Sequence, residues 1–127
     1  MTFEQRLCRS WAVIFAIAGA GFLVEPDLVA ALLNGLADGL GLASGMGAGR
    51  DTLWYPLALS LMAVLVLLAW EAGAPAAPPL AFRALLLSKL ASTGGFAWLA
   101  LTVAGGWWLC AGADGFVAAT LLFARGR

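Results

Sequence analysis

Apolar residues fall into four long runs along the chain, separated by short breaks rich in glycine, proline or charge. The first run extends from Trp11 to Val24 behind a short head that carries Arg6 and Arg9. Counted back to Leu7, it supplies the ~20 residues with which a helix crosses a bilayer. A basic head before an apolar core also occurs in signal peptides. Because no clear small-x-small cleavage site follows, we expect this run to remain as a membrane anchor over about 7–24.

The remaining three runs also have the length and apolar character of membrane spans. Residues 53–70 contain no charged side chain, and residues 84–104 contain only Lys89. The last run, about 107–124, contains Asp114 and is followed by Arg-Gly-Arg. Glycine residues 105–106 mark a hairpin between the last two runs. The pattern therefore predicts three further transmembrane helices over 53–70, 84–104 and 107–124.

The segment between the first two runs has a different, amphipathic pattern. Glu25-Pro26-Asp27 ends the first helix and favours the start of another, since proline and acids are favoured in a first helical turn. Leucines then recur at helical spacing, but Asn34 and Asp38 interrupt them. We expect an interfacial helix over about 27–40 and a glycine-rich loop from Gly39 to Gly49. The predicted fold is an all-α, single-domain, four-helix transmembrane bundle (residues 1–127) with this extra interfacial helix in its first outer loop.

Composition supports a membrane environment and argues against one class of partner. The 127 residues are 63% hydrophobic and 11% charged, with a mean hydropathy of +0.96. Soluble domains are about half apolar and a quarter charged, so lipid is the expected solvent and partner. Seven basic and seven acidic residues give no net charge. Nucleic acid is not an expected partner, because phosphate binding needs a clustered positive surface.

The distribution of charge predicts the orientation in the membrane. With the N-terminus in the cytoplasm, most basic residues lie on the inner side: Arg6, Arg9, Arg83, Lys89, Arg125 and Arg127. Arg50 would lie outside, together with the acids Glu25, Asp27, Asp38 and Asp51. This obeys the positive-inside rule. Aromatic residues agree, since Trp11 and Trp70 map to the inner interface and Trp54, Tyr55, Trp107 and Trp108 to the outer one. We expect both termini to be cytoplasmic.

Lys89 and Asp114 are the two charged residues that fall well inside predicted spans. Such groups are costly in lipid and usually face a bundle interior or a cavity. One interpretation is a polar site formed by Lys89, Asp114 and Ser92. The other is that Lys89 extends to the inner surface while Asp114 lies near the outer headgroups. Helical rise places Lys89 about two turns deeper than Asp114, a gap that the lysine stem or a water would have to bridge.

Other chemistry has little support in the sequence. The chain has no histidine, so His-ligated haem, His-ligated zinc and a Ser-His-Asp triad cannot come from it. Cys8 and Cys110 form no CxxC motif. No nucleophile, base and orienting group stand out together, so we expect neither catalysis nor a metal site, and the sequence identifies no cofactor.

The layout resembles small bacterial four-helix membrane proteins that include the DoxX-like proteins. The matching features are the basic head before Trp11, the Glu25-Pro26-Asp27 break with its amphipathic stretch, and the Asp114-Gly115 step in the last span. The resemblance covers most of the chain as layout and carries no site motif. It implies the bacterial inner membrane as the location, in agreement with the alanine- and glycine-rich composition.

Three functions remain open from the sequence. The first is an accessory or structural subunit of a larger membrane complex, suggested by the small size and large apolar surface. The second is a small oligomeric transporter or channel whose path is lined by Asp114 and Lys89. The third is a lipid- or quinone-binding membrane protein. Expected partners are the bilayer together with other membrane subunits or further copies of this chain.

Overall fold

A computed structural model describes residues 1–43, 45 and 54–125. Over these residues the chain forms five α-helices and no strand. Residues 44 and 46–49 of the predicted glycine-rich loop lie outside the described residues, as do Arg50, Asp51 and Arg127. The side-chain positions predicted for Trp54 and Tyr55 also lie outside them. The all-helical class predicted from the apolar pattern is confirmed for the described part of the chain.

The first two helices are separated by a single residue. Helix α1 (Phe3–Val24) begins four residues before the predicted span, because Thr2 forms a capping box with Gln5 at its start. Helix α2 (Pro26–Gly39) follows, with Pro26 in its first turn. Leu42 and Leu40 then donate backbone hydrogen bonds to carbonyl groups of the last turn of α2, where the helix ends. The predicted helix over about 27–40 is therefore present.

The other three helices follow the three remaining apolar runs. They are α3 (Trp54–Ala72), α4 (Pro79–Thr102) and α5 (Trp107–Arg125). Helix α4 begins five residues earlier than predicted, since Pro79 occupies the first helical position, where its missing N–H costs nothing. Short turns at residues 73–78 and 103–106 connect these helices, so that each is antiparallel to the next.

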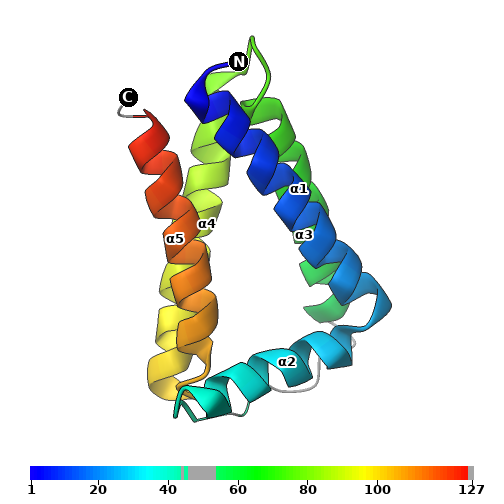
Figure 1. The fold of residues 1–127 in the computed structure, drawn as a ribbon, viewed down its shortest axis with the longest axis vertical. Coiled ribbons are helices and arrows are strands. Elements are labelled where there is room, and N and C mark those ends of the chain that lie inside the picture. The colour runs from blue at the N-terminus through cyan, green and yellow to red at the C-terminus, as the bar shows by residue number, and fades with distance from the viewer. Residues whose placement is uncertain (44, 46–53, 126–127) are drawn as a thin grey trace.

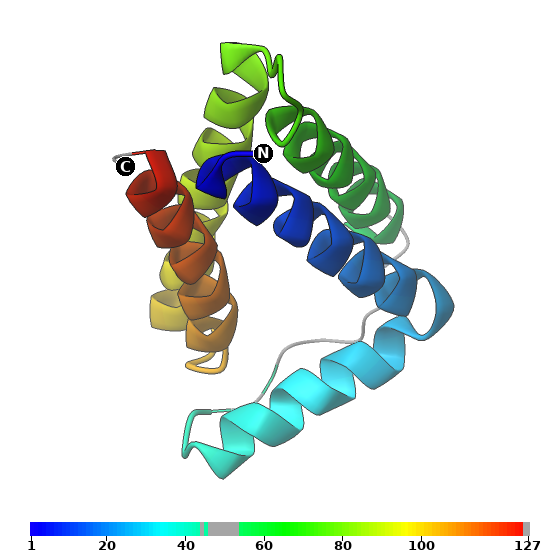
Figure 2. The same ribbon diagram turned by 45° about the horizontal axis from the view of Figure 1, so that its top comes forward.

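The long helices pack as two pairs that diverge from a common end. Helix α1 packs along α3, and α4 packs along α5. The pairs meet at the end where both chain termini lie and separate toward the other end, which α2 crosses (Figure 1). The rotated view shows the same arrangement, with α2 at the edge of the molecule (Figure 2). A backbone hydrogen bond of 2.9 Å from Gly106 to Ala43 connects the α4–α5 turn to the segment after α2.

The buried core lies where the two pairs meet. It contains residues from all four long helices: Cys8, Ala12, Phe15, Leu65, Ala69, Ala72, Ala81, Phe82, Leu85, Val117 and Leu121. Many large apolar side chains on the outside remain exposed, among them Ile17, Leu87 and Phe116. Contiguous apolar surface of this kind is typical of contact with lipid or with another protein.

Three of the helices have the length and composition needed to cross a bilayer. These are α1, α4 and α5, and the apolar segment found in α3 is shorter, Ala58–Ala72. Since a spanning helix needs about 20 mainly apolar residues, these three helices mark the chain as a membrane protein. The number of crossings depends on whether α3 also spans the membrane.

Candidate functional site

Lys89, Ser92 and Asp114 lie together between α4 and α5. The Lys89 ammonium nitrogen is 2.8 Å from Asp114 Oδ1, within an ion pair. Ser92 Oγ lies 2.5 Å from Asp114 Oδ2. Each carboxylate oxygen therefore has its own donor from α4, and charge-assisted contacts of this kind are among the stronger hydrogen bonds in proteins. The three residues named from the sequence as one site are brought together by the structure.

The ion pair is largely shielded from the surroundings of the chain. The exposed fraction of the side chain is 6% for Lys89 and 18% for Asp114. On the side of α1, the ring of Phe15 lies 4.6 Å from the ammonium nitrogen, within cation–π range. Burying two charges costs several kcal/mol per ion, which only good geometry and further hydrogen bonds offset. The lysine does not extend to the surface, and its charge is neutralised inside the protein.

The serine hydroxyl has two acceptors within reach but only one proton to donate. Asp114 Oδ2 is at 2.5 Å, and the backbone carbonyl of Lys89 is at 3.2 Å. The shorter contact to a charged acceptor is favoured. The neighbouring Thr93 hydroxyl donates to the same Lys89 carbonyl at 2.7 Å. Serine and threonine hydroxyls within helices commonly donate a hydrogen bond to a backbone carbonyl of the preceding turn.

The register of the α4–α5 hairpin explains how residues at different heights meet. Ser92 lies one turn nearer the hairpin than Lys89, so Asp114 receives one donor directly and the other by way of the long lysine stem. Close approach of the two helices is helped by Gly115. A Cβ atom at this position would lie 3.5 Å from the Thr93 methyl group, in ordinary contact. No bridging water is needed to close the gap expected from the sequence.

A second polar contact joins α1 to α5 near the ion pair. The Trp11 indole Nε1 donates to Thr120 Oγ1 at 3.2 Å. The Trp11 ring also stacks on Phe15 at 5.9 Å and meets Phe116 edge-on at 6.2 Å. Sequence reasoning assigned Trp11 only to an interfacial belt. Its inward packing, like the role of Phe15, could not be read from the sequence, because α1 carries apolar residues on every side.

The chemistry open to this site is limited. Among the described residues, no three His, Cys, Asp or Glu side chains come close enough to hold a metal ion. Lys89 and Asp114 neutralise each other, and the hydroxyl beside them bonds to the same carboxylate. Such an arrangement holds two helices together, and it places one partly accessible carboxylate in the interior.

Comparisons with known proteins found no relative of this chain. No family model matches the chain, and neither a curated protein nor a solved structure is similar to it. The function is therefore argued from the residues of the chain itself.

Proposed function

We propose that the protein is a polytopic protein of the bacterial inner membrane with four spanning helices: α1, α3, α4 and α5. Helix α2 would lie along the outer interface. Two features support this topology. Both termini lie at one end of the molecule, as expected for an even number of crossings (Figure 1). The acids Glu25, Asp27 and Asp38 belong to the segment at the opposite end, which supports a cytoplasmic location for the arginine-rich end.

We further propose that the protein acts as an accessory or structural subunit of a larger membrane complex. The observation that carries this proposal is the Lys89–Asp114–Ser92 cluster, whose charges and donors are directed at one another inside the α4–α5 hairpin. A cluster satisfied in this way stiffens the hairpin rather than presenting a reactive group. The outer surface of the helices is correspondingly apolar and available for lipid and protein contacts.

Gentle extraction from native membranes followed by native mass spectrometry tests this role. We expect a partner protein at fixed stoichiometry. Replacement of an exposed apolar residue by a larger one, such as Leu87→Trp on α4, should release the partner if that face is the contact. The matched change Leu61→Trp on α3 serves as a control for a different exposed face. A protein recovered alone from native membranes under these conditions contradicts the subunit role.

A small oligomeric transporter is a second candidate, favoured by one observation. Asp114 keeps 18% of its side chain exposed although it lies inside the fold. Partly accessible intramembrane acids are typical of ion and proton routes. If this candidate is correct, proteoliposomes should show ion flux that Asp114→Asn abolishes and Ser10→Ala, at an exposed serine of α1, does not. Absence of flux from the wild-type protein rejects the transporter.

A further inference from the structure

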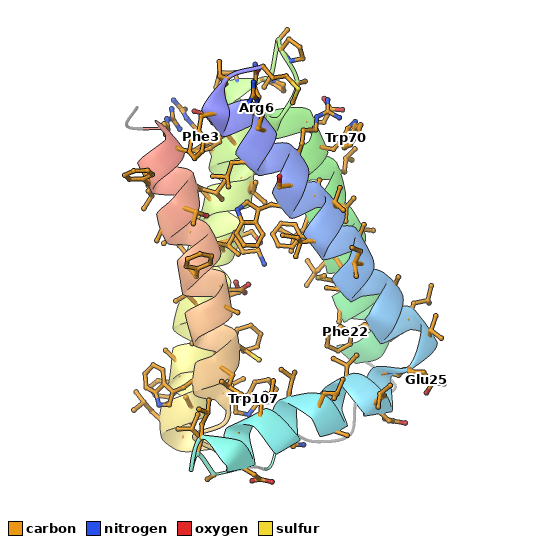
Figure 3. All side chains as sticks on the ribbon, in the orientation of Figure 1. Phe3, Arg6, Phe22, Glu25, Trp70 and Trp107 are labelled. Atoms are coloured by element: carbon orange, nitrogen blue, oxygen red, sulfur yellow. The ribbon has the colours of Figure 1, made fainter. Side chains whose placement is uncertain are left out.

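The end of the molecule that holds both termini carries arginines without acidic partners. Arg6, Arg9, Arg83 and Arg125 all lie there, and among the described residues none forms an ion pair. Figure 3 shows Arg6 at this end and Trp70 close to it on the outer side of α3. The guanidinium carbon of Arg9 lies 3.5 Å from the centre of the Trp70 ring. Arg9 Nε is buried and has no hydrogen-bond partner.

The position of Arg9 is determined by the turn between α3 and α4. A Cβ atom at Gly73 would come within 2.7 Å of Arg9 Cγ and 2.9 Å of the Gln5 carbonyl oxygen, so only glycine leaves room for the arginine stem. Gln5 Nε2 in turn donates to the Ala74 carbonyl at 3.3 Å. Arg9 is thus held in place before any anion arrives. Arg9 Nε is enclosed, but Arg9 as a whole is only partly buried, so the rest of the guanidinium is open to an anion.

An apolar groove lies between α1 and α3. It begins at Phe15, six residues beyond Arg9, and extends toward α2 as far as Leu23. It has a volume of about 340 Å³, and its lining includes Ala16, Gly19 and Ala20 of α1 with Met62 and Ala63 of α3. A spacing of seven residues along each helix relates Arg9 and Trp70 to residues that line the groove. Arg9 precedes Ala16 by seven residues, and Trp70 follows Ala63 by seven. Residues seven apart share one face of a helix, so the Arg9–Trp70 pair lies on the groove side of α1 and α3, about one to two turns from the near edge of the groove.

We propose that this pair and the groove form a binding site for one anionic phospholipid. The phosphate accepts hydrogen bonds from the terminal amino groups of the Arg9 guanidinium, and an acyl chain lies in the groove between α1 and α3. Guanidinium–phosphate contacts are charge-assisted, and the guanidinium plane suits the geometry of the anion. The proposal rests on the membrane location proposed above.

The combination of features favours a lipid over a soluble phosphate. A soluble anion would use only the arginine, and the adjoining groove would have no role. In a membrane, the arginine-rich end lies on the cytoplasmic side, where anionic lipids concentrate. Trp70 is half exposed beside the guanidinium, as expected for a ring at headgroup level. The groove is lined by apolar side chains, with small ones at Ala16, Gly19 and Ala20, which suits a hydrocarbon chain.

Native mass spectrometry of the full-length protein, released from micelles containing phosphatidylglycerol and phosphatidylcholine, tests the site. We expect about a tenfold preference for the anionic lipid, in line with the strength of one charged hydrogen bond. Arg9→Gln should abolish the preference. The matched control Arg83→Gln, at an exposed arginine of the same end, should keep it. Equal losses in the two variants overturn the proposal, because they indicate a general attraction to positive charge.

Two further measurements separate the parts of the proposal. Ala16→Phe should fill the groove and reduce binding of both lipids, and an unchanged affinity rejects the acyl-chain position. Displacement of the lipid by excess inorganic phosphate also rejects it, since only the headgroup would then matter. Quenching of Trp70 fluorescence by brominated phosphatidylglycerol, isolated by subtracting a Trp70→Phe variant, requires no change at Arg9. Absence of quenching contradicts the site even if the Arg9 variant fails to fold.

Membrane insertion is measured first by alkaline carbonate extraction. Release of the protein by carbonate rejects the proposed membrane location itself. If the protein stays in the membrane but shows no lipid preference, only the proposed lipid site is rejected.

Discussion

Substitutions at the Lys89–Asp114 pair should destabilise the protein unequally, and the double substitution should cost less than either charge removed alone. Asp114→Ala leaves the Lys89 ammonium with a 6% exposed side chain and the Phe15 ring as its remaining neighbour. A buried charge without its partner costs about 3–5 kcal/mol. Interhelical hydrogen bonds in membrane proteins contribute only about 0.6 kcal/mol on average. We therefore expect a loss in the free energy of unfolding near the lower end, about 3 kcal/mol.

Lys89→Met should be milder, at about 1–3 kcal/mol. Asp114 then keeps the Ser92 donor and its 18% exposure, so its charge is less isolated than that of Lys89 in the other variant. The double variant Lys89→Met with Asp114→Leu removes both charges and fills the space with apolar atoms, so its stability should lie within about 1 kcal/mol of the wild type. Ser92 retains an acceptor in the carbonyl of residue 89 at 3.2 Å.

Unfolding in mixed micelles of dodecyl maltoside and SDS, followed by tryptophan fluorescence, gives the four free energies for a double-mutant cycle. Our account requires a clear coupling energy between the two positions. Additive losses, with the double variant the least stable of the set, would refute the view that the two side chains form one buried unit. The order Lys89→Met worse than Asp114→Ala would refute the argument from exposure.

Three other sets of substitutions test the packing. Gly73→Ala places a Cβ atom 2.7 Å from a side-chain carbon of α1, so it should lower the free energy of unfolding in micelles by about 1–3 kcal/mol. Gly94→Ala has nothing within 4 Å and should be neutral or stabilise by up to about 1 kcal/mol, and equal effects of the two variants would contradict the close approach at Gly73. Trp11→Phe and Thr120→Val should each cost about 0.5–1.5 kcal/mol, and together less than the sum of the two, since both remove the same 3.2 Å hydrogen bond. Full additivity in the double-mutant cycle counts against that bond. Gly115→Leu should lower the melting temperature while Gly115→Ala is tolerated, because a Cβ atom there lies 3.5 Å from its neighbour; a tolerated leucine shows that the hairpin is looser than described.

Helix positions were largely predictable because the apolar runs are long and their breaks are chemically distinct. Glu25 and Gly105 lie between helices in the structure, at the breaks that the sequence also marks. The starts of α1 and α4 were missed by four and five residues. Capping at Thr2 and the first-turn position of Pro79 extend those helices into polar or proline-rich sequence, where the pattern of apolar residues does not predict a helix.

The meeting of Lys89, Ser92 and Asp114 could be anticipated, since a short turn forces α4 and α5 to be neighbours. The Arg9–Trp70 pair could not. Both residues were assigned separately to the inner interface, but their contact depends on the α1–α3 pairing and on the space left at Gly73. Helices α1 and α3 are joined through α2 and a long connection, so no hairpin rule predicts which faces meet. Side-chain chemistry near a tight turn is therefore easier to predict than chemistry across distant segments.

The number of membrane crossings is the central claim, and the location of the two termini tests it most directly. Three helices meet the criteria for spanning on length and composition, and α3 is proposed as the fourth. Single-cysteine variants at Thr2 and Arg125, made in a background with Cys8 and Cys110 replaced by serine, can be labelled in intact spheroplasts with a membrane-impermeant maleimide. Four crossings predict that neither site is labelled until the membrane is permeabilised. Labelling of one terminus and protection of the other would mean an odd number of crossings and would contradict the account.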